Sequence, residues 1–248
     1  MDNNLTDREF WLNYWESKTG LITKIDLKNY FTPLFKEVMN KYKVKSAIEI
    51  GGFPGYQTLY LNLKYDVKST LLDYIIHKEK IAELIEFNGI ANDSINLIET
   101  DFFNYDPKEK YDLVFSIGFI EHFRDTKEQL ELHAKYLNEN GTLLIIVPNF
   151  LGINGWMNKN FDKENFDKHY LECMDKNHLE SLTNEIGLNV KSSEYYGGFS
   201  IWLENYSSHS GLFKFMFKTV WAVGKVFSKV FRMETKLMSP YTVLVATK

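Results

Sequence analysis

Cysteine, a basic excess and long uncharged apolar stretches are scarce or missing in this sequence. Cys173 is the only cysteine among 248 residues, which excludes an intramolecular disulfide and a cysteine-rich metal site. The formal net charge of −4 leaves no positive excess to neutralise phosphates, so nucleic acid is not an expected partner. No run of about 18 uncharged apolar residues appears, and the first residues lack the pattern of a signal peptide. We therefore expect a cytoplasmic protein and predict no metal site.

The sequence does contain a regular alternation of short apolar runs and longer helical patterns. A hydrophobic fraction of 44% and an aromatic fraction of 16% can supply a substantial core. The alternation predicts an α/β fold, with a doubly wound, mostly parallel sheet and helices on both faces. Predicted strands span 44–50, 67–74, 94–100, 111–117, 142–147, 188–196 and 241–247. Predicted helices span 7–19, 26–42, 56–64, 77–88, 126–137 and 174–186, and Pro33 is expected to kink or delay the second of them.

The stretch 44–55 is the most informative one. An apolar strand ends in Glu49, and Gly51, Gly52 and Gly55 crowd the residues after it. Glycine lets the backbone adopt conformations that other residues avoid, and it lets a ligand approach the main chain closely. A phosphate cradle would avoid a carboxylate at the tip of the strand, whereas a ligand with an amino group would favour one.

Acids and aromatics also follow the next strands of the predicted sheet. Asp73 ends the second strand, where its carboxylate could accept hydrogen bonds from ribose hydroxyls. Asp101 and Phe102 follow the third, and an acid beside an aromatic ring suits an adenine. The segment 116–118 ends the fourth strand. In an open parallel sheet, ligands bind outside the carboxyl ends of the strands, so we expect these groups to converge on one crevice.

This series, in this order, resembles the class I S-adenosylmethionine-dependent methyltransferases. The family's glycine signature, an acid followed by glycines at alternate positions, stands here as Glu49-Ile50-Gly51-Gly52-Phe53-Pro54-Gly55, with Phe53 in place of the middle glycine. The segment Ser116-Ile117-Gly118-Phe119-Ile120-Glu121-His122 resembles the corresponding part of small-molecule methyltransferases similar to quinone-biosynthesis enzymes. The resemblance covers roughly residues 40–195.

The resemblance implies a fold, a cofactor and a set of site residues. The implied fold is a Rossmann-like sheet of seven strands whose last strand is antiparallel. The implied cofactor is S-adenosylmethionine, with its ammonium group held by Glu49, its ribose by Asp73, and its adenine by Asp101 and Phe102. The full implied cofactor site comprises Glu49, Gly51, Gly52, Gly55, Asp73, Tyr74, Asp101, Phe102, Ser116 and Gly118.

The reaction implied is in-line methyl transfer to oxygen or carbon of a small-molecule or lipid-like acceptor. A base is needed if an alcohol is methylated, and less so for a phenol or an activated carbon. His122 and His169 are the catalytic candidates. His122 follows the fourth predicted strand, and His169 lies just before the predicted helix 174–186, where the enzymes that this chain resembles often have a substrate-side histidine.

The N-terminal segment and two insertions are expected to form the part of the crevice that binds the methyl acceptor. We expect residues 1–42 to contribute helices to a lid and 43–248 to form the methyltransferase domain. Cap insertions are expected at 149–170, which looks like a long loop, and at 197–239.

The segment 211–233 allows two interpretations. It is strongly apolar, and no acid lies between Glu204 and Glu234. Its basic residues recur at helical spacing, which predicts a basic helical face. The helix could lie at a membrane surface, or it could be a cap that buries its apolar face on the core; Gly224 is a candidate break. The basic residues are Lys214, Lys218, Lys225, Lys229 and Arg232.

Two alternative functions remain open at this point. A degenerate, non-catalytic methyltransferase fold could serve as a membrane-associated partner protein, motivated by Phe53 and the basic segment. A nicotinamide-dependent oxidoreductase is less favoured, because the Gly-x-Gly-x-x-Gly fingerprint starting at Gly51 fails at Phe53 and Tyr56. The sequence does not decide the acceptor or the oligomeric state.

Overall fold

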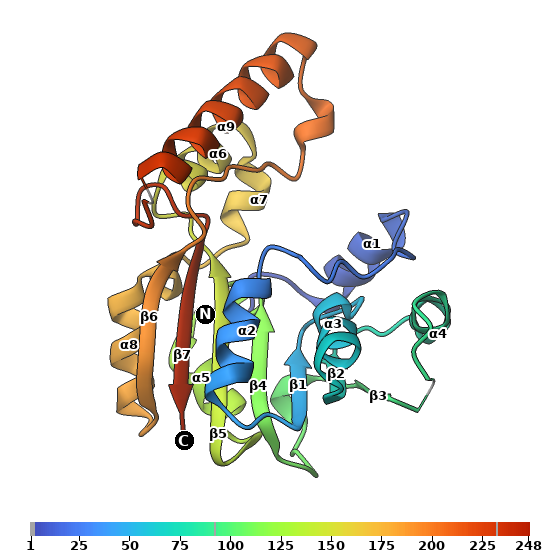
Figure 1. The fold of residues 1–248 in the computed structure, drawn as a ribbon. Coiled ribbons are helices and arrows are strands. Elements are labelled where there is room, and N and C mark those ends of the chain that lie inside the picture. Colours follow the sequence, from blue (N-terminus) through green and yellow to red (C-terminus); the bar gives the residue numbers. More distant parts are fainter. Residues whose placement is uncertain (1–2, 92, 232) are drawn as a thin grey trace.

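A single seven-stranded sheet forms the centre of the computed structural model, which describes residues 3–91, 93–231 and 233–248 (Figure 1). The strand order is β3-β2-β1-β4-β5-β7-β6. β7 pairs antiparallel with both of its neighbours, and the remaining pairs are parallel, as predicted. The strands are β1 (Ser46–Ile50), β2 (Lys68–Asp73), β3 (Ile95–Glu99), β4 (Tyr111–Ile117), β5 (Leu137–Pro148), β6 (Asn189–Tyr196) and β7 (Tyr241–Thr247).

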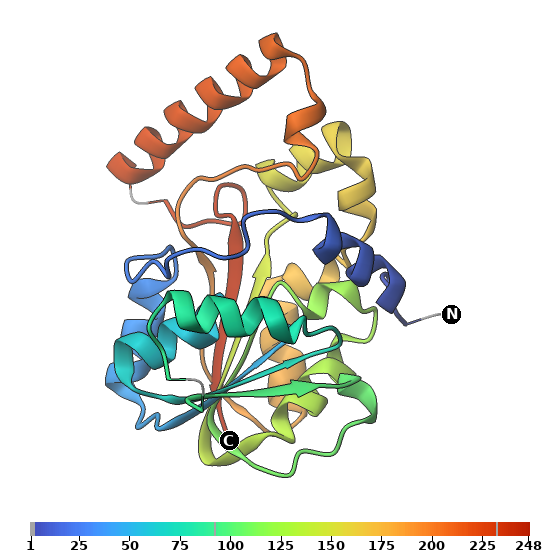
Figure 2. The same cartoon turned by 90° about the vertical axis from the view of Figure 1, so that its right-hand side faces the viewer.

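Helices cover both faces of this sheet and bury one apolar cluster on each (Figures 1 and 2). Strand β1 shows why: Ala47 belongs to one cluster, whereas its neighbour Ile48 belongs to the other. A strand buried on both faces reads as a continuous apolar run, which is the pattern of this segment. The helices are α1 (Arg8–Ser17), α2 (Thr32–Lys41), α3 (Tyr56–Tyr65), α4 (Lys78–Phe87), α5 (Thr126–Ala134), α6 (Ile153–Phe161), α7 (Lys163–Asp167), α8 (Lys176–Glu185) and α9 (Gly211–Phe231).

Two segments differ from the expected elements in ways that have physical causes. The helix expected from residue 26 begins only at Thr32, with Pro33 in its first turn, where a missing N–H costs nothing. The segment 149–170 is not a long loop, because it folds into α6 and α7. Asn158 is buried there, and its side-chain amide donates to the carbonyl oxygens of Asn154 and Trp202. Asn158, one of the asparagines that suggested a loop, therefore links α6 to the backbone of the segment after β6.

Helix α9 is continuous and stands away from the sheet (Figures 1 and 2). Gly224 does not break it; a Cβ at this position would lie 2.2 Å from the ring of Phe199, so the glycine permits close packing. Only Phe217 and Ser228 are buried, which contradicts the alternative of a cap that buries its apolar face on the core. No helix in the described part of the chain is long and apolar enough to span a membrane. Arg232, the fifth predicted basic residue, lies outside the described residues.

Candidate active site

A pocket of about 820 Å³ opens at the carboxyl ends of β1, β2 and β4, beside the point where the strand order reverses. This is where an open α/β sheet binds its ligands. The pocket brings together both predicted catalytic histidines and most of the predicted cofactor site. The predicted residues that line it are Glu49, Gly51, Gly52, Asp73, Tyr74, Asp101, Phe102, Gly118, His122 and His169.

Gly55 and Ser116 do not line this pocket. The Ser116 hydroxyl is buried 3.1 Å from Nε2 of His133, so it lies within the core. Gly55 has φ of +89° immediately before α3, and its N–H donates to the carbonyl oxygen of Gly52 at 2.7 Å. Both residues therefore lie behind the residues that line the pocket.

The turn after β1 requires glycine at two positions for different reasons. Gly51 has φ of +67°, and a Cβ there would lie 2.1 Å from the ring of Phe119. Gly52 has no room for a side chain because the carboxyl group of Glu49 occupies the space, and a Cβ at Gly52 would lie only 2.3 Å from Cδ of that acid. The glycine motif therefore accommodates the acid that precedes it.

Glu49 is a buried acid at the base of the pocket. Its Oε2 accepts hydrogen bonds from the Thr58 hydroxyl and from the Thr58 backbone N–H, the latter at 2.8 Å, in the first turn of α3. Burial raises the pKa of Glu49 to about 7, although the bonds from Thr58 act in the opposite direction and nearby Asp73 adds to the rise. A cationic group in the pocket would favour the ionised carboxylate.

Asp73 connects the end of β2 to the glycine turn. Its Oδ2 accepts from the N–H of Phe53 at 2.9 Å, and its Oδ1 accepts from the N–H of Ile75 at 3.0 Å. Burial raises the pKa of Asp73 to about 6, against the effect of these backbone bonds. Each carboxylate oxygen can accept more than one hydrogen bond, so capacity remains for two ligand hydroxyls.

Asp101 is already engaged by its own turn. Its Oδ1 accepts from the N–H of Phe103 at 3.0 Å, and its Oδ2 accepts from the side-chain amide of Asn104 at 2.7 Å. Phe102 is buried beside it, with its ring stacked on Tyr136 at a centroid distance of 5.8 Å. Asp101 therefore has a local structural role in addition to its position at the pocket.

The N-terminal helix α1 contributes four aromatic side chains to the pocket, Phe10 and three others. Trp11, Tyr14 and Trp15 all line it. The Trp15 ring meets Phe53 edge-on at a centroid distance of 5.1 Å, and Trp11 meets His122 at 5.0 Å. That this helix contributes to a lid stays a prediction.

Glu121, His122 and His169 form a cluster that the sequence pattern indicated only in part. Each offers one ligand atom, and these atoms lie within 4.8 Å of one another. Nδ1 of His122 lies 2.9 Å from the carbonyl oxygen of Lys168, and Nδ1 of His169 lies 2.7 Å from that of Asn165. A carbonyl oxygen can only accept, so each Nδ1 carries the proton and each Nε2 keeps its lone pair.

Glu121 is the member of the cluster that the sequence did not single out. It is buried, and its Oε2 has no hydrogen-bond partner among the described residues. Burial raises the pKa of Glu121 to about 8. Burial also lowers the pKa of His122 to about 3, with His169 adding to the effect, and lowers that of His169. Both imidazoles are therefore neutral with a free Nε2 lone pair, and Glu121 becomes an additional proton acceptor as the pH rises through about 8. This arrangement suits a hydrogen-bond donor or a cation. The only signal in the sequence was the adjacency of Glu121 to His122.

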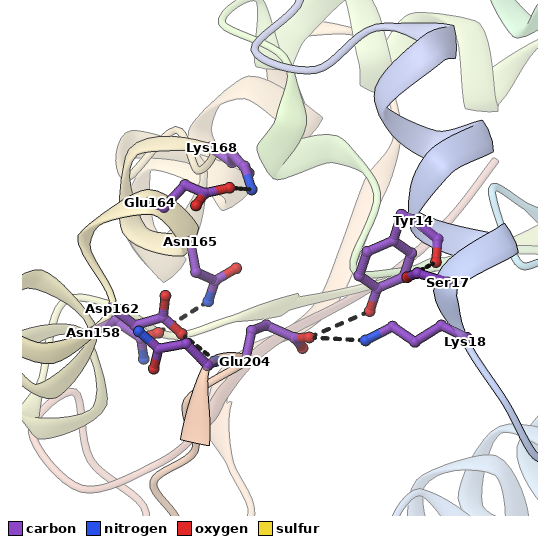
Figure 3. Close-up of polar contacts among 10 residues, drawn as sticks. Tyr14, Ser17, Lys18, Asn158, Asp162, Glu164, Asn165, Lys168 and Glu204 are labelled. Carbon is purple, nitrogen blue, oxygen red and sulfur yellow. Dashed lines mark hydrogen bonds and ion pairs between the residues drawn. The ribbon is translucent and has the colours of Figure 1, made fainter. Parts of the chain in front are cut away.

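Polar side chains from three separate segments surround the outer part of the pocket (Figure 3). Glu204 accepts from the Tyr14 hydroxyl at 3.4 Å and from Nζ of Lys18 at 3.3 Å, which joins the insertion after β6 to α1. Asp162 accepts from the backbone N–H of Asn205 at 2.9 Å. The N-terminal segment and both insertions thus meet at the mouth of the pocket.

Comparison with known proteins identifies the family. Residues 26–193 match the profile of a methyltransferase domain family, and because this is more than half of the chain, the chain belongs to that family. The predicted resemblance to methyltransferases is therefore confirmed, whereas the similarity to quinone-biosynthesis enzymes stays a prediction. Comparison with curated protein sequences gives no significant match.

Solved structures share the fold at low sequence identity. A SAM-dependent methyltransferase from Archaeoglobus fulgidus superposes with a TM-score of 0.57 at 16% identity, covering 96% of this chain and 100% of that one. Phosphoethanolamine N-methyltransferase 2 from Haemonchus contortus, in complex with S-adenosyl-L-methionine, gives 0.58 at 13% identity over 87% of this chain and 52% of that one. An O-methyltransferase family protein from Burkholderia thailandensis gives 0.53 at 14% identity over 88% and 56%. These likenesses establish the Rossmann-like fold.

Proposed function

We propose that this protein transfers the methyl group of S-adenosylmethionine to an oxygen atom of a small, partly apolar acceptor. One observation carries the proposal. The strand-end acids, the glycine turn and the Glu121–His122–His169 cluster, which lie far apart in the sequence, line a single pocket in a chain of the methyltransferase family.

The donor half of the pocket fits S-adenosylmethionine. Glu49 is a buried carboxyl group beside backbone that only glycine can occupy, and it suits the ammonium group of the methionine moiety. Asp73 has acceptor capacity for the two ribose hydroxyls. Asp101 and Phe102 are assigned to the adenine. Bound there, the cofactor would supply an electrophilic methyl group.

The acceptor half carries both aromatic and proton-accepting groups. Trp11 and Phe123 contribute apolar surface, and Glu121, His122 and His169 contribute lone pairs. An acceptor hydroxyl can donate a hydrogen bond to this cluster, whereas an unactivated carbon cannot. This is why we favour oxygen over carbon as the methylated atom, with an apolar or lipid-like remainder packed under α1.

Glu121 is a better general base than His122 in this arrangement. Proton transfer is most efficient when the pKa of the base lies near the working pH. The pKa of Glu121 is about 8, whereas that of His122 is about 3, so a proton leaving the acceptor is held more stably on the carboxylate. The two neutral imidazoles orient the hydroxyl through Nε2. Positioning of this kind can contribute roughly 7–11 kcal/mol to lowering a barrier.

A second candidate role for the cluster follows from its composition. Two imidazole nitrogens and one carboxylate within 4.8 Å also form a ligand set for a divalent cation, which would lower the pKa of a bound hydroxyl. The two roles differ in their response to chelators.

The alternatives raised by the sequence are less well supported. The methyltransferase family match and the failed fingerprint argue against a nicotinamide-dependent oxidoreductase. The open pocket with its buried titratable cluster argues against a degenerate, non-catalytic fold, because such groups cluster at functional sites.

An assay of S-adenosylhomocysteine formation tests the proposal. Purified protein would be mixed with S-adenosylmethionine and, in separate reactions, a phenol, a catechol, an aliphatic alcohol, a primary amine and an isoprenoid-substituted quinol. We expect turnover above the acceptor-free rate with at least one hydroxyl compound. Turnover with the amine alone would contradict the assignment to oxygen, and no turnover together with no cofactor binding would contradict methyl transfer altogether.

A further inference from the structure

Helix α9 leaves most of its apolar surface uncovered. Its inner side packs on a small cluster that contains Phe199, Ile201 and Leu203, through Phe217 and the close approach at Gly224. The helix has 21 residues, a length of about 31 Å at 1.5 Å per residue. Its burial on the protein is therefore confined to one narrow strip.

The uncovered apolar residues form one continuous face. At 3.6 residues per turn six of them fall within an arc of roughly 100°, along the whole length of the helix. The exposed Val220, Phe227 and Phe231 widen this face on the side away from the lysines. Thr219 lies in the same arc, but its hydroxyl donates to the carbonyl oxygen of Phe215 at 2.9 Å and is satisfied within the helix. A soluble monomer rarely exposes a contiguous apolar patch of this kind without a partner. The six residues of the arc are Leu212, Phe215, Met216, Val223, Val226 and Val230, whose exposed fractions lie between 58% and 71%.

A basic strip runs beside this face. Four lysines recur at spacings of four, seven and four residues, and no acid lies between Glu204 and Glu234, although the net charge of the whole chain is −4. Lys218 and Lys229 are exposed. Lys225 lies over the rings of Tyr30 and Trp221, at 5.3 and 5.6 Å from their centroids. The positive charge is therefore concentrated next to the apolar face in an otherwise acidic protein.

We propose that this surface docks onto a lipid bilayer that contains anionic headgroups. The apolar arc would enter the boundary between headgroups and acyl chains, while the lysines pair with the anionic lipids. The charge pattern favours lipid over a second copy of the chain, because a second α9 would present the same lysines and no acid to pair with them. The helix lies on the surface rather than across it, since it is not apolar enough to span a bilayer. The inference does not depend on the identity of the acceptor.

Flotation of the full-length protein with vesicles tests this proposal. One set of vesicles contains phosphatidylcholine alone, and the other contains phosphatidylcholine mixed with phosphatidylglycerol. We expect the wild type to float with the anionic vesicles and to be released as the salt concentration rises. The variant Lys218→Gln/Lys229→Gln should bind more weakly by roughly fivefold per lysine removed. Its matched control, Lys78→Gln/Lys191→Gln, replaces exposed lysines outside α9 and should bind like the wild type.

The contribution of the apolar face to vesicle binding is tested with a second matched pair of variants. Phe215→Ser and Phe87→Ser each remove one exposed phenylalanine from a helix, but only Phe215 belongs to the apolar face of α9. We expect vesicle binding to fall in Phe215→Ser and to stay unchanged in Phe87→Ser. In Phe215→Ser/Val223→Ser/Val226→Ser it should fall at least tenfold. Equal binding by all variants, or no binding by the wild type, would overturn the proposal. So would a dimer in vesicle-free solution that the triple variant converts to a monomer, because the face would then belong to a second copy.

Discussion

The backbone N–H of Phe53 donates a hydrogen bond to Asp73, with 2.9 Å between the nitrogen and Oδ2. Phe53 stands at the position where the glycine signature described in the sequence analysis would have its middle glycine. Its side chain is buried and lies between Trp15 and His77, at centroid distances of 5.1 and 5.4 Å. Phe53 therefore links the glycine turn both to the second strand and to the aromatic side chains of α1, and it lines the pocket.

The pKa of Glu49 makes cofactor affinity depend on pH. Without cofactor the carboxyl group is half protonated near pH 7, and an ammonium group favours its ionised form. The affinity for S-adenosylmethionine should therefore rise as the pH increases from 6 to 8, with release of a proton. Calorimetric titration in buffers of different ionisation enthalpy measures this proton. In Glu49→Gln the affinity should be weaker and less dependent on pH, with the remaining dependence confined to the range near pH 6 where Asp73 titrates; an unchanged pH dependence would contradict the assignment.

The carboxyl group of Glu49 should also lower the stability of the cofactor-free protein as the pH rises. The pKa of Glu49 is raised from 4.5 to about 7, so its stabilising contribution is fully present below 4.5 and is lost as the pH rises through 7. The change is on the order of 3 kcal/mol, at 1.36 kcal/mol per pKa unit. Urea unfolding at pH 5 and pH 8 should show a smaller decrease in the free energy of unfolding for Glu49→Gln than for the wild type. Parallel decreases would count against a buried Glu49.

The glycine turn can be tested with a matched pair of substitutions. Gly51 and Gly20 both have positive φ, +67° and +71°, but a Cβ at Gly51 meets the Phe119 ring, whereas a Cβ at Gly20 meets nothing within 4 Å. Both alanine variants therefore carry similar backbone strain, and only Gly51→Ala overpacks the site. We expect Gly51→Ala to be less stable than Gly20→Ala by about 1–3 kcal/mol. Equal losses in urea unfolding would show that Phe119 does not fill this space.

Glu121 should control the rate of methyl transfer and not the affinity for the cofactor. With a hydroxyl acceptor identified, Glu121→Gln should lower kcat by about 10²–10⁴-fold and leave the affinity for S-adenosylmethionine unchanged. The wild-type rate should rise with pH through about 8, because the ionised carboxylate is the base. Glu131→Gln, at an exposed position on α5, is the control. A rate that is abolished by a chelator and restored by a divalent cation would instead assign the cluster to a metal.

The strand-end acids could be predicted from the sequence because the information is local. A buried apolar strand that ends in Glu49 or Asp73 places the acid at the edge of a parallel sheet whatever the rest of the chain does. Pro33 similarly fixed where α2 begins. Ser116 shows the limit of this reasoning: it ends a strand too, but its side chain points into the core toward His133.

The role of Glu121 in the cluster and the internal structure of the insertions could not be predicted because they depend on tertiary contacts. Glu121 becomes unusual only when burial removes water from its carboxyl group and when His169, far along the chain, lies beside His122. The segment 149–170 looked like a loop because its asparagines are polar, yet Asn158 is satisfied inside the fold. The helical spacing in 211–233 was compatible both with a cap and with a helix at a membrane surface, and periodicity alone could not show which apolar residues of α9 stay exposed.

Titration of S-adenosylmethionine into the wild type and into Asp73→Asn tests the central claim most directly. Asp66→Asn, an exposed acid at the end of α3, is the control, and thermal melts establish that each variant is folded. The account predicts that the wild type and the control bind with the same affinity and that folded Asp73→Asn binds at least tenfold more weakly, a loss of about 1.4 kcal/mol or more. A wild type that does not bind the cofactor, or a folded Asp73→Asn that binds as tightly as the wild type, would contradict it.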